Sequence, residues 1–121
     1  MADKLWSGRF SGKSHPAAEA FTESVSFDKR LALYDIVGSM AHARMLAKCG
    51  VITQDEADRI LGGLETLLGK VRGGTFEFRP DLEDVHANVE VALADLIGPV
   101  AGKLHTARSR NDQVSLDLRL Y

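Results

Sequence analysis

The sequence has little of what several classes of protein require. It contains one cysteine, Cys49, among its 121 residues, which excludes an internal disulfide and a zinc site built from several cysteines. No run approaches the roughly 18 consecutive apolar residues that a membrane-spanning helix needs. The first ten residues lack the apolar stretch of a secretory signal. These absences predict a protein of the reduced cytoplasm with no membrane partner.

Neither sign of charge is in excess. The chain has 15 Lys and Arg residues against 17 Asp and Glu residues, so its formal net charge of -2 provides no general attraction to nucleic acid. We therefore expect no nucleic-acid partner. The length and the hydrophobic fraction of 45% are those of an ordinary globular domain with a core of its own.

Alternation of apolar and polar residues, the mark of a strand, is also missing, and helical spacing takes its place. Thr53 and Glu56 fit a capping box at the start of a helix that ends at Gly73 and Gly74. The apolar stripe of this helix comprises Ala57, Ile60, Leu61, Leu64, Leu67, Leu68 and Val71. A preceding helix over about 28–48 has a stripe of Leu33, Ile36, Val37 and Met40, and a following helix before Gly98-Pro99 has one of Val85, Val89, Ala92, Leu93 and Leu96. The sequence predicts an all-α fold, with an antiparallel helix hairpin followed by a third helix.

A last helix is predicted to start at the end of the chain. Ser109, with an acid three residues later, is typical of a helix start, and Val114, Leu118 and Tyr121 share one face beyond it. We divide the chain into an N-terminal helical domain over 1–108, with an extended arm over 1–16, and the start of a helical-bundle domain over 109–121. This last helix has no stop signal, so we expect the remainder of the bundle to be absent from the chain.

The densest polar stretch, residues 103–113, is the first candidate site. Arg108 and Arg110 lie beside the predicted helix start, where free backbone N–H groups and the helix dipole favour an anion. Arginine can also grip a carboxylate with two hydrogen bonds. The stretch could bind a small carboxylate or phosphate. The alternative is a solvated loop with internal ion pairs, such as Arg110 with Asp112.

A second polar cluster covers residues 83–90. His86 and Glu90 are four residues apart and can pair on a helix, while Asp84 falls in its first turn, where a negative charge suits the dipole. No second histidine stands at metal-binding spacing, so we expect no metal. The alternative is a surface histidine beside ordinary first-turn acids. Ser24 and Ser26 precede the first long helix, and from the residues alone capping of that helix is the favoured explanation.

These motifs together resemble one family. Residues 103–113, Lys-Leu-His-Thr-Ala-Arg-Ser-Arg-Asn-Asp-Gln, resemble the first signature stretch of argininosuccinate lyases. Glu83-Asp84-Val85-His86, with Asn88 and Glu90, resembles the helix that precedes it, and residues 5–10 resemble the family's opening Leu-Trp-Gly-Gly-Arg-Phe. Ser7 and Ala107 stand where glycine is usual; both are small. The resemblance covers essentially all of the chain.

The resemblance implies a homotetrameric lyase that cleaves argininosuccinate to arginine and fumarate by β-elimination, in arginine biosynthesis or the urea cycle, without metal or organic cofactor. It implies that Ser24, Arg110 and Asn111 bind the substrate and that Asp84 and His86 support the same pocket. In the family the catalytic serine, and the histidine discussed as the acid, come later in the sequence. We therefore expect the 121-residue chain to be inactive alone. The alternatives are a silent structural relative, like a δ-crystallin, and a helical oligomerisation module.

Overall fold

The computed structural model describes residue 17 and residues 29–82 and 84–121, and all regular structure in these ranges is helical. The elements in order are η1 (Lys29–Leu31), α3 (Ala32–Lys48), α4 (Gln54–Arg72), η2 (Pro80–Leu82), α5 (Val85–Ile97), η3 (Gly98–His105) and α6 (Arg110–Leu120). The predicted all-α class is confirmed for this part of the chain. None of its helices is long and apolar enough to cross a bilayer. Ser24 and the predicted arm over 1–16 lie outside the described residues.

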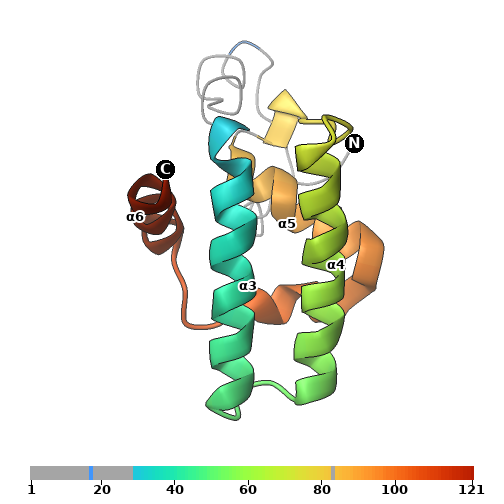
Figure 1. Ribbon diagram of the computed structural model, residues 1–121, viewed down its shortest axis with the longest axis vertical. Coiled ribbons are helices and arrows are strands. Elements are labelled where there is room, and N and C mark those ends of the chain that lie inside the picture. Colours follow the sequence, from blue (N-terminus) through green and yellow to red (C-terminus); the bar gives the residue numbers. More distant parts are fainter. Residues whose placement is uncertain (1–16, 18–28, 83) are drawn as a thin grey trace.

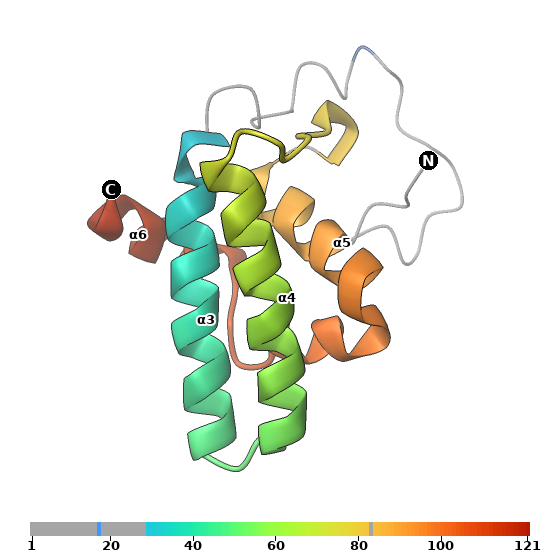
Figure 2. The ribbon, with the colours of Figure 1, turned by 45° about the vertical axis from the view of Figure 1, so that its right-hand side comes forward.

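The predicted hairpin is present. Helices α3 and α4 run antiparallel, side by side, and a short turn joins them at one end (Figures 1 and 2). Gly50 takes φ +74° in this turn, a conformation that a residue with a β carbon adopts only with strain. Thr53 Oγ1 accepts from the backbone N–H of Glu56 at 3.1 Å, and Glu56 Oε1 accepts from that of Thr53 at 3.0 Å. The predicted capping box therefore fixes the start of α4.

The core is built around the apolar stripe of α4. Ile60, Leu64 and Leu67 are fully buried against α3 and α5, as the sequence predicted. The prediction for α3 is partly wrong, because Val37 is 43% exposed. Polar Asp35 and Ser39 take buried positions on this helix instead. Helix α3 therefore presents an apolar side to α4 and a polar side elsewhere.

Helix α5 packs across one face of the hairpin, behind it in the view of Figure 1. Asp84 is the N-cap of this helix, not a residue of its first turn, and its Oδ1 accepts from the N–H of Ala87 at 2.7 Å. Gly98, at φ +79°, ends α5 as predicted. The eight-residue η3 that follows was not predicted. It forms because Pro99 suits a helix start and because Val100 and Leu104 are buried against the hairpin.

Helix α6 lies on the side of α3 that faces away from α4 (Figures 1 and 2). Ser109 caps it as predicted, with Asp112 completing the capping box. Among the side chains of α6 that the structure describes, the buried ones are Gln113 and Asp117, both polar. The predicted apolar face of Val114, Leu118 and Tyr121 is exposed.

Gly63 of α4 is a test of the packing between α4 and α5. A β carbon there would lie 2.6 Å from Leu93 Cδ1 and 2.9 Å from Ile97 Cγ2, and Leu93 is buried with little room to move. We expect Gly63→Ala to lower the free energy of unfolding by about 1–2 kcal/mol in urea titrations. The neighbouring Gly62→Ala is the matched control, because its β carbon would meet nothing within 4 Å. That variant should gain about 0.5–1 kcal/mol from helix propensity. Equal effects of the two substitutions would contradict the packing described here.

Candidate functional site

One buried carboxylate oxygen, Asp35 Oδ1, joins three helices. His86 Nδ1 of α5 lies 2.8 Å from it, and Gln113 Nε2 of α6 donates to it at 3.3 Å. Asp35, His86 and Gln113 are all at most 3% exposed. Because a carboxylate accepts hydrogen bonds, His86 carries a proton on Nδ1. The hydrogen bond to His86 fixes the orientation of the imidazole ring, and the one to Gln113 attaches α6 to α3.

A second carboxylate completes this cluster. Asp117 Oδ2 lies 3.6 Å from His86 Nδ1, and the Asp117 side chain is 1% exposed. Burial, assisted by the negative charge of Asp35, raises the pKa of Asp117 to about 7. Burial alone would lower the pKa of His86, but the hydrogen bond to Asp35 and its charge outweigh burial and raise that pKa. Asp117 and His86 therefore hold protons more tightly than they would in water.

The same three side chains are the metal-ligand group found among the described residues. One ligand atom from each of Asp35, His86 and Asp117 lies within 4.8 Å of the others. Asp35 Oδ2 and Asp117 Oδ2 also have no hydrogen-bond partner in the described part of the chain. A set of two oxygens and one imidazole nitrogen suits a divalent ion chemically. The 2.8 Å contact of His86 with Asp35 gives the same groups a pairing that needs no ion.

Arg110 contacts two acidic side chains, the N-cap of α5 and a residue within that helix. Its Nε lies 3.3 Å from Asp84 Oδ2, its Nη1 lies 3.2 Å from Glu90 Oε1, and Nη1 also donates to Gln113 Oε1 at 2.8 Å. The pairing of Arg110 with Asp112, offered as an example of the alternative, is not among these contacts, since Asp112 is engaged in the capping box instead. Arg110 is brought to Asp84 because it stands in the first turn of α6 and Asp84 caps α5.

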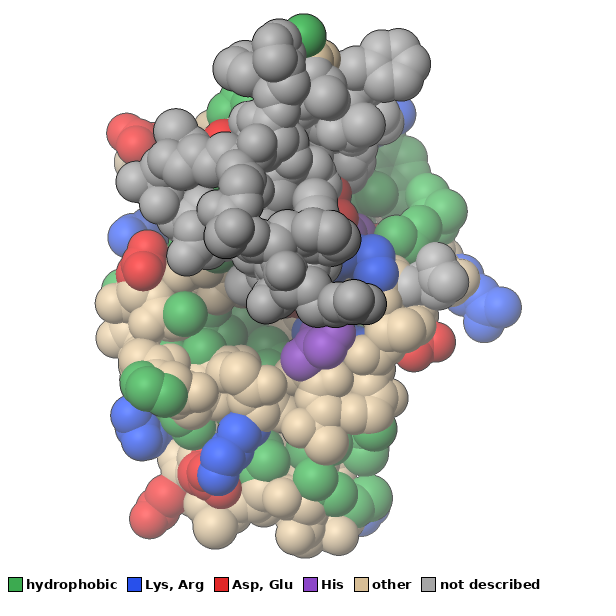
Figure 3. Space-filling model, turned by 180° about the vertical axis from the view of Figure 1, so that it is seen from behind, with side chains coloured by type: hydrophobic (Ala, Val, Ile, Leu, Met, Phe, Trp, Pro, Cys, Tyr) green, Lys and Arg blue, Asp and Glu red, His purple; other side chains and the backbone are tan. Residues whose placement is uncertain are grey.

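The predicted pairing of His86 with Glu90 is wrong. His86 is turned inward to Asp35, whereas Glu90 binds Arg110 and lies 3.5 Å from His105 Nδ1. Burial of His86 against α3 explains the difference, because i,i+4 spacing brings two side chains near each other but does not choose between partners. In Figure 3, histidine and basic side chains lie close together near the middle of the face seen from behind.

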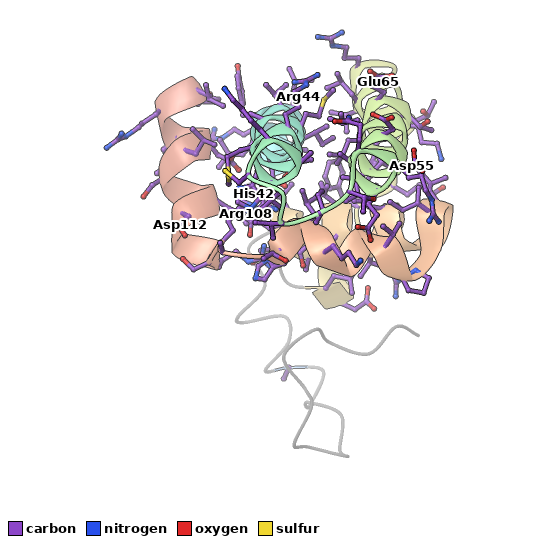
Figure 4. The ribbon with its side chains drawn as sticks, turned by 90° about the horizontal axis from the view of Figure 1, so that it is seen from below. His42, Arg44, Asp55, Glu65, Arg108 and Asp112 are labelled. Carbon is purple, nitrogen blue, oxygen red and sulfur yellow. The ribbon has the colours of Figure 1, made fainter. Side chains whose placement is uncertain are left out.

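The other arginine of the motif, Arg108, contacts α3. Arg108 Nη1 donates to Ser39 Oγ of α3 at 2.9 Å, and burial lowers the pKa of Arg108 while leaving it protonated. Nearby, His42 Nε2 lies 2.8 Å from the carbonyl oxygen of Thr106. Figure 4 shows His42, Arg108 and Asp112 together where the segment before α6 passes α3. Ala107 has φ 59° there, the region that favours glycine.

A pocket of about 360 Å³ opens between α3, this segment and α6. Asp35, Asp117 and Arg108 contribute charged side chains to its lining, and Gly38 and Leu116 contribute apolar atoms. Its lining does not include Asp84, His86 or Arg110. Gln113 does line the pocket and also accepts a hydrogen bond from Arg110, so it connects the pocket with Arg110.

Three of the five predicted site residues come together in the structure. Asp84 contacts Arg110 directly, and His86 is linked to Arg110 through Asp35 and Gln113. Asn111 follows Arg110 in α6, but its side chain lies outside the described residues, as does Ser24. The roles assigned to these residues stay predictions.

The sequence reasoning missed Asp35, Gln113 and Asp117. Asp35 directly precedes Ile36 of the predicted stripe, so an acid beside the core positions of an amphipathic helix was the available signal. Gln113 and Asp117 carried a weaker signal, since they are four residues apart and so share a face of α6.

The buried cluster predicts a pH dependence of stability. The pKa of Asp117 is 3.8 ordinarily and about 7 in the folded protein, so between these values the folded state binds more protons than the unfolded chain. The free energy of unfolding must then fall as pH rises through this interval, and the raised pKa of His86 acts in the same sense. We expect Asp117→Asn, which cannot ionise, to flatten this fall and to be more stable than the native chain at pH 8, by on the order of 1 kcal/mol.

Urea unfolding at pH 5 and pH 8 measures this effect. Asp95→Asn is the control, because Asp95 is an exposed aspartate of α5 and its loss should leave the pH dependence as it is. A fall of native steepness in the Asp117→Asn variant would show that Asp117 does not hold the proton.

Comparisons with known proteins agree with the motif. A family model described as "Lyase" matches residues 8–121. The chain is 57% identical over 121 residues to an argininosuccinate lyase of Syntrophotalea carbinolica, covering all of this chain and 26% of that protein. It is 57% identical over 122 residues to an argininosuccinate lyase of Nitratidesulfovibrio vulgaris, covering all of this chain and 26% of that protein. It is 58% identical over 118 residues to one of Deinococcus deserti, covering 98% of this chain and 25% of that protein.

The chain thus spans about a quarter of the length of the curated relatives it matches. The matched residues include every part of the cluster around Asp35 and Arg110. Since the family model covers nearly the whole sequence, the chain belongs to the lyase family.

Proposed function

We propose that the protein cleaves argininosuccinate to arginine and fumarate by β-elimination, and that this chain supplies part of the site that holds a substrate carboxylate. The observation that carries the proposal is the placement of Arg110 in the first turn of α6, within a chain 57% identical to proteins named argininosuccinate lyase. A helix start and a guanidinium group both favour an anion at the same place.

The contacts of Arg110 leave part of its guanidinium group for a ligand. Its Nε and Nη1 contact Asp84, Glu90 and Gln113, while its Nη2 has no hydrogen-bond partner among the described residues. The side chain is 34% exposed. Two nitrogens thus orient the group and the third can donate to a carboxylate. The first N–H groups of α6 add to the attraction, since they have no partner within their own helix.

This arrangement suits β-elimination. Removing a proton from the carbon next to a carboxylate builds negative charge on that carboxylate, and a positioned arginine stabilises this charge. The C–N bond then breaks with its electron pair on the guanidine nitrogen, which takes a proton from a general acid. His86 is engaged through Nδ1 by a buried aspartate, so we assign it a supporting role together with Asp84. We expect the general base and acid to come from segments outside this chain, and the chain alone to show no turnover.

Ser24 and Asn111 complete the proposed contacts to the substrate. Arginine biosynthesis, a cytoplasmic location and a homotetrameric assembly belong to the same proposal, which also assumes no metal or organic cofactor. Similarity to the relatives named above supports these points. The alternatives of a silent structural relative or an oligomerisation module gain no support from those relatives, whose names all give the lyase activity.

Substitutions in the full-length protein test the proposal. Arg110→Ala and Asn111→Ala should each lower kcat by more than about tenfold, because each removes a donor to charge that develops in the transition state. Fumarate release, followed by its ultraviolet absorbance, measures kcat, and circular dichroism checks that folding is retained.

Arg44→Ala is the matched control, since Arg44 is an exposed arginine of α3 that points away from His42 and Arg108 in Figure 4. It should leave kcat unchanged. Native kcat in both the Arg110→Ala and the Asn111→Ala variants would remove these residues from the site.

A further inference from the structure

We propose that Gln113 is a positioning residue that holds Arg110 in the orientation needed to bind the substrate carboxylate. The inference rests on the proposed function and adds to it a residue for which neither the motif nor the comparisons give a role. Gln113 is 3% exposed and lies between a buried aspartate and the guanidinium group. It touches both of them through opposite ends of one amide.

The partners determine which way this amide points. Arginine has only donors, so the atom of Gln113 that meets Arg110 Nη1 at 2.8 Å is the oxygen Oε1. A carboxylate is an acceptor, so the atom that meets Asp35 Oδ1 at 3.3 Å is the nitrogen Nε2. A flipped amide would place two donors together at one end and two acceptors together at the other. The amide therefore has one favourable orientation.

Asp35, the partner of Gln113 on the side away from Arg110, is itself held in place. Asp35 is 2% exposed, stands on α3 of the hairpin, and is also held by His86 of α5 at 2.8 Å. Through Gln113 and Asp35, the position of Arg110 is therefore fixed relative to α3 and α5. A side chain held through such a second layer of hydrogen bonds loses less freedom when the ligand binds.

Gln113 differs from the other partners of Arg110 in its charge. Asp84 and Glu90 are acids that neutralise the guanidinium group, and their side chains are 27% and 21% exposed. The neutral amide of Gln113 orients the group without cancelling more of its charge. An anionic substrate therefore meets no further negative charge at Gln113.

A double-mutant cycle in the full-length protein tests the inference. Gln113→Leu removes both hydrogen bonds while keeping a side chain of similar size, and we expect kcat/KM to fall about tenfold. Adding Gln113→Leu to Arg110→Ala should change kcat/KM by less than about twofold, because a residue that acts through Arg110 has no effect once Arg110 is absent. Adding it to Arg44→Ala should give the full tenfold fall again.

Two further variants keep the test decisive. Gln54→Leu, at an exposed glutamine that donates to Asp58, is the matched control and should leave kcat/KM unchanged. If Gln113→Leu fails to fold, Gln113→Asn takes its place in the cycle, since its shorter amide cannot reach both partners.

The outcomes separate the two proposals. Effects of Gln113 and Arg110 that multiply, or a Gln113→Leu variant with native kcat/KM beside a defective Arg110→Ala variant, would overturn the positioning role and leave the proposed function standing. An Arg110→Ala variant with native kcat/KM would overturn the role of Arg110 in the proposed function, and the positioning role with it.

Discussion

The hydrogen bonds to Asp35 Oδ1 hold together the parts of this molecule that matter for its chemistry. A buried carboxylate is costly unless donors surround it. Here one donor comes from α5 and one from α6, at 2.8 Å and 3.3 Å. Each helix therefore satisfies a charge that the hairpin buries. Without this aspartate, His86 and Gln113 would lose their shared partner and α6 its main polar contact with α3.

The hairpin divides two tasks between its helices. Helix α4 presents a continuous apolar stripe and supplies much of the core, whereas α3 uses one side for that core and the other for polar side chains. Function is better placed on such rigid elements than on loops, because a binding residue must be held to within a fraction of an ångström. Arg110, in the first turn of a helix, gains this precision through Asp84 and Glu90 at α5 and through Gln113, which connects it to α3.

The parts of the fold that could be predicted are those that depend on nearby residues. The capping boxes at Thr53 and Ser109 connect atoms three residues apart, and the stripe of α4 repeats within one helix, so sequence spacing was enough. The η3 segment was missed because it forms where Val100 and Leu104 are buried by distant helices.

The site shows the same division between local and distant information. Family resemblance pointed to Asp84, His86 and Arg110, which the structure places in one network. It gave no indication of their partners, and i,i+4 spacing favoured the wrong one for His86. The actual pairings join residues 51 and 78 positions apart in the sequence. Only the packing of three helices brings such groups together.

Helix α6 has the reverse of the usual distribution, with Gln113 and Asp117 buried and Val114, Leu118 and Tyr121 exposed. Water around newly exposed apolar surface raises the heat capacity, whereas water around polar surface lowers it. The buried side chains described on α6 are polar, whereas those of α4 are mainly apolar, so local opening of α6 should carry a smaller heat-capacity change than opening of α4. The contact between α3 and α6 should accordingly respond to temperature in a different way from the rest of the molecule.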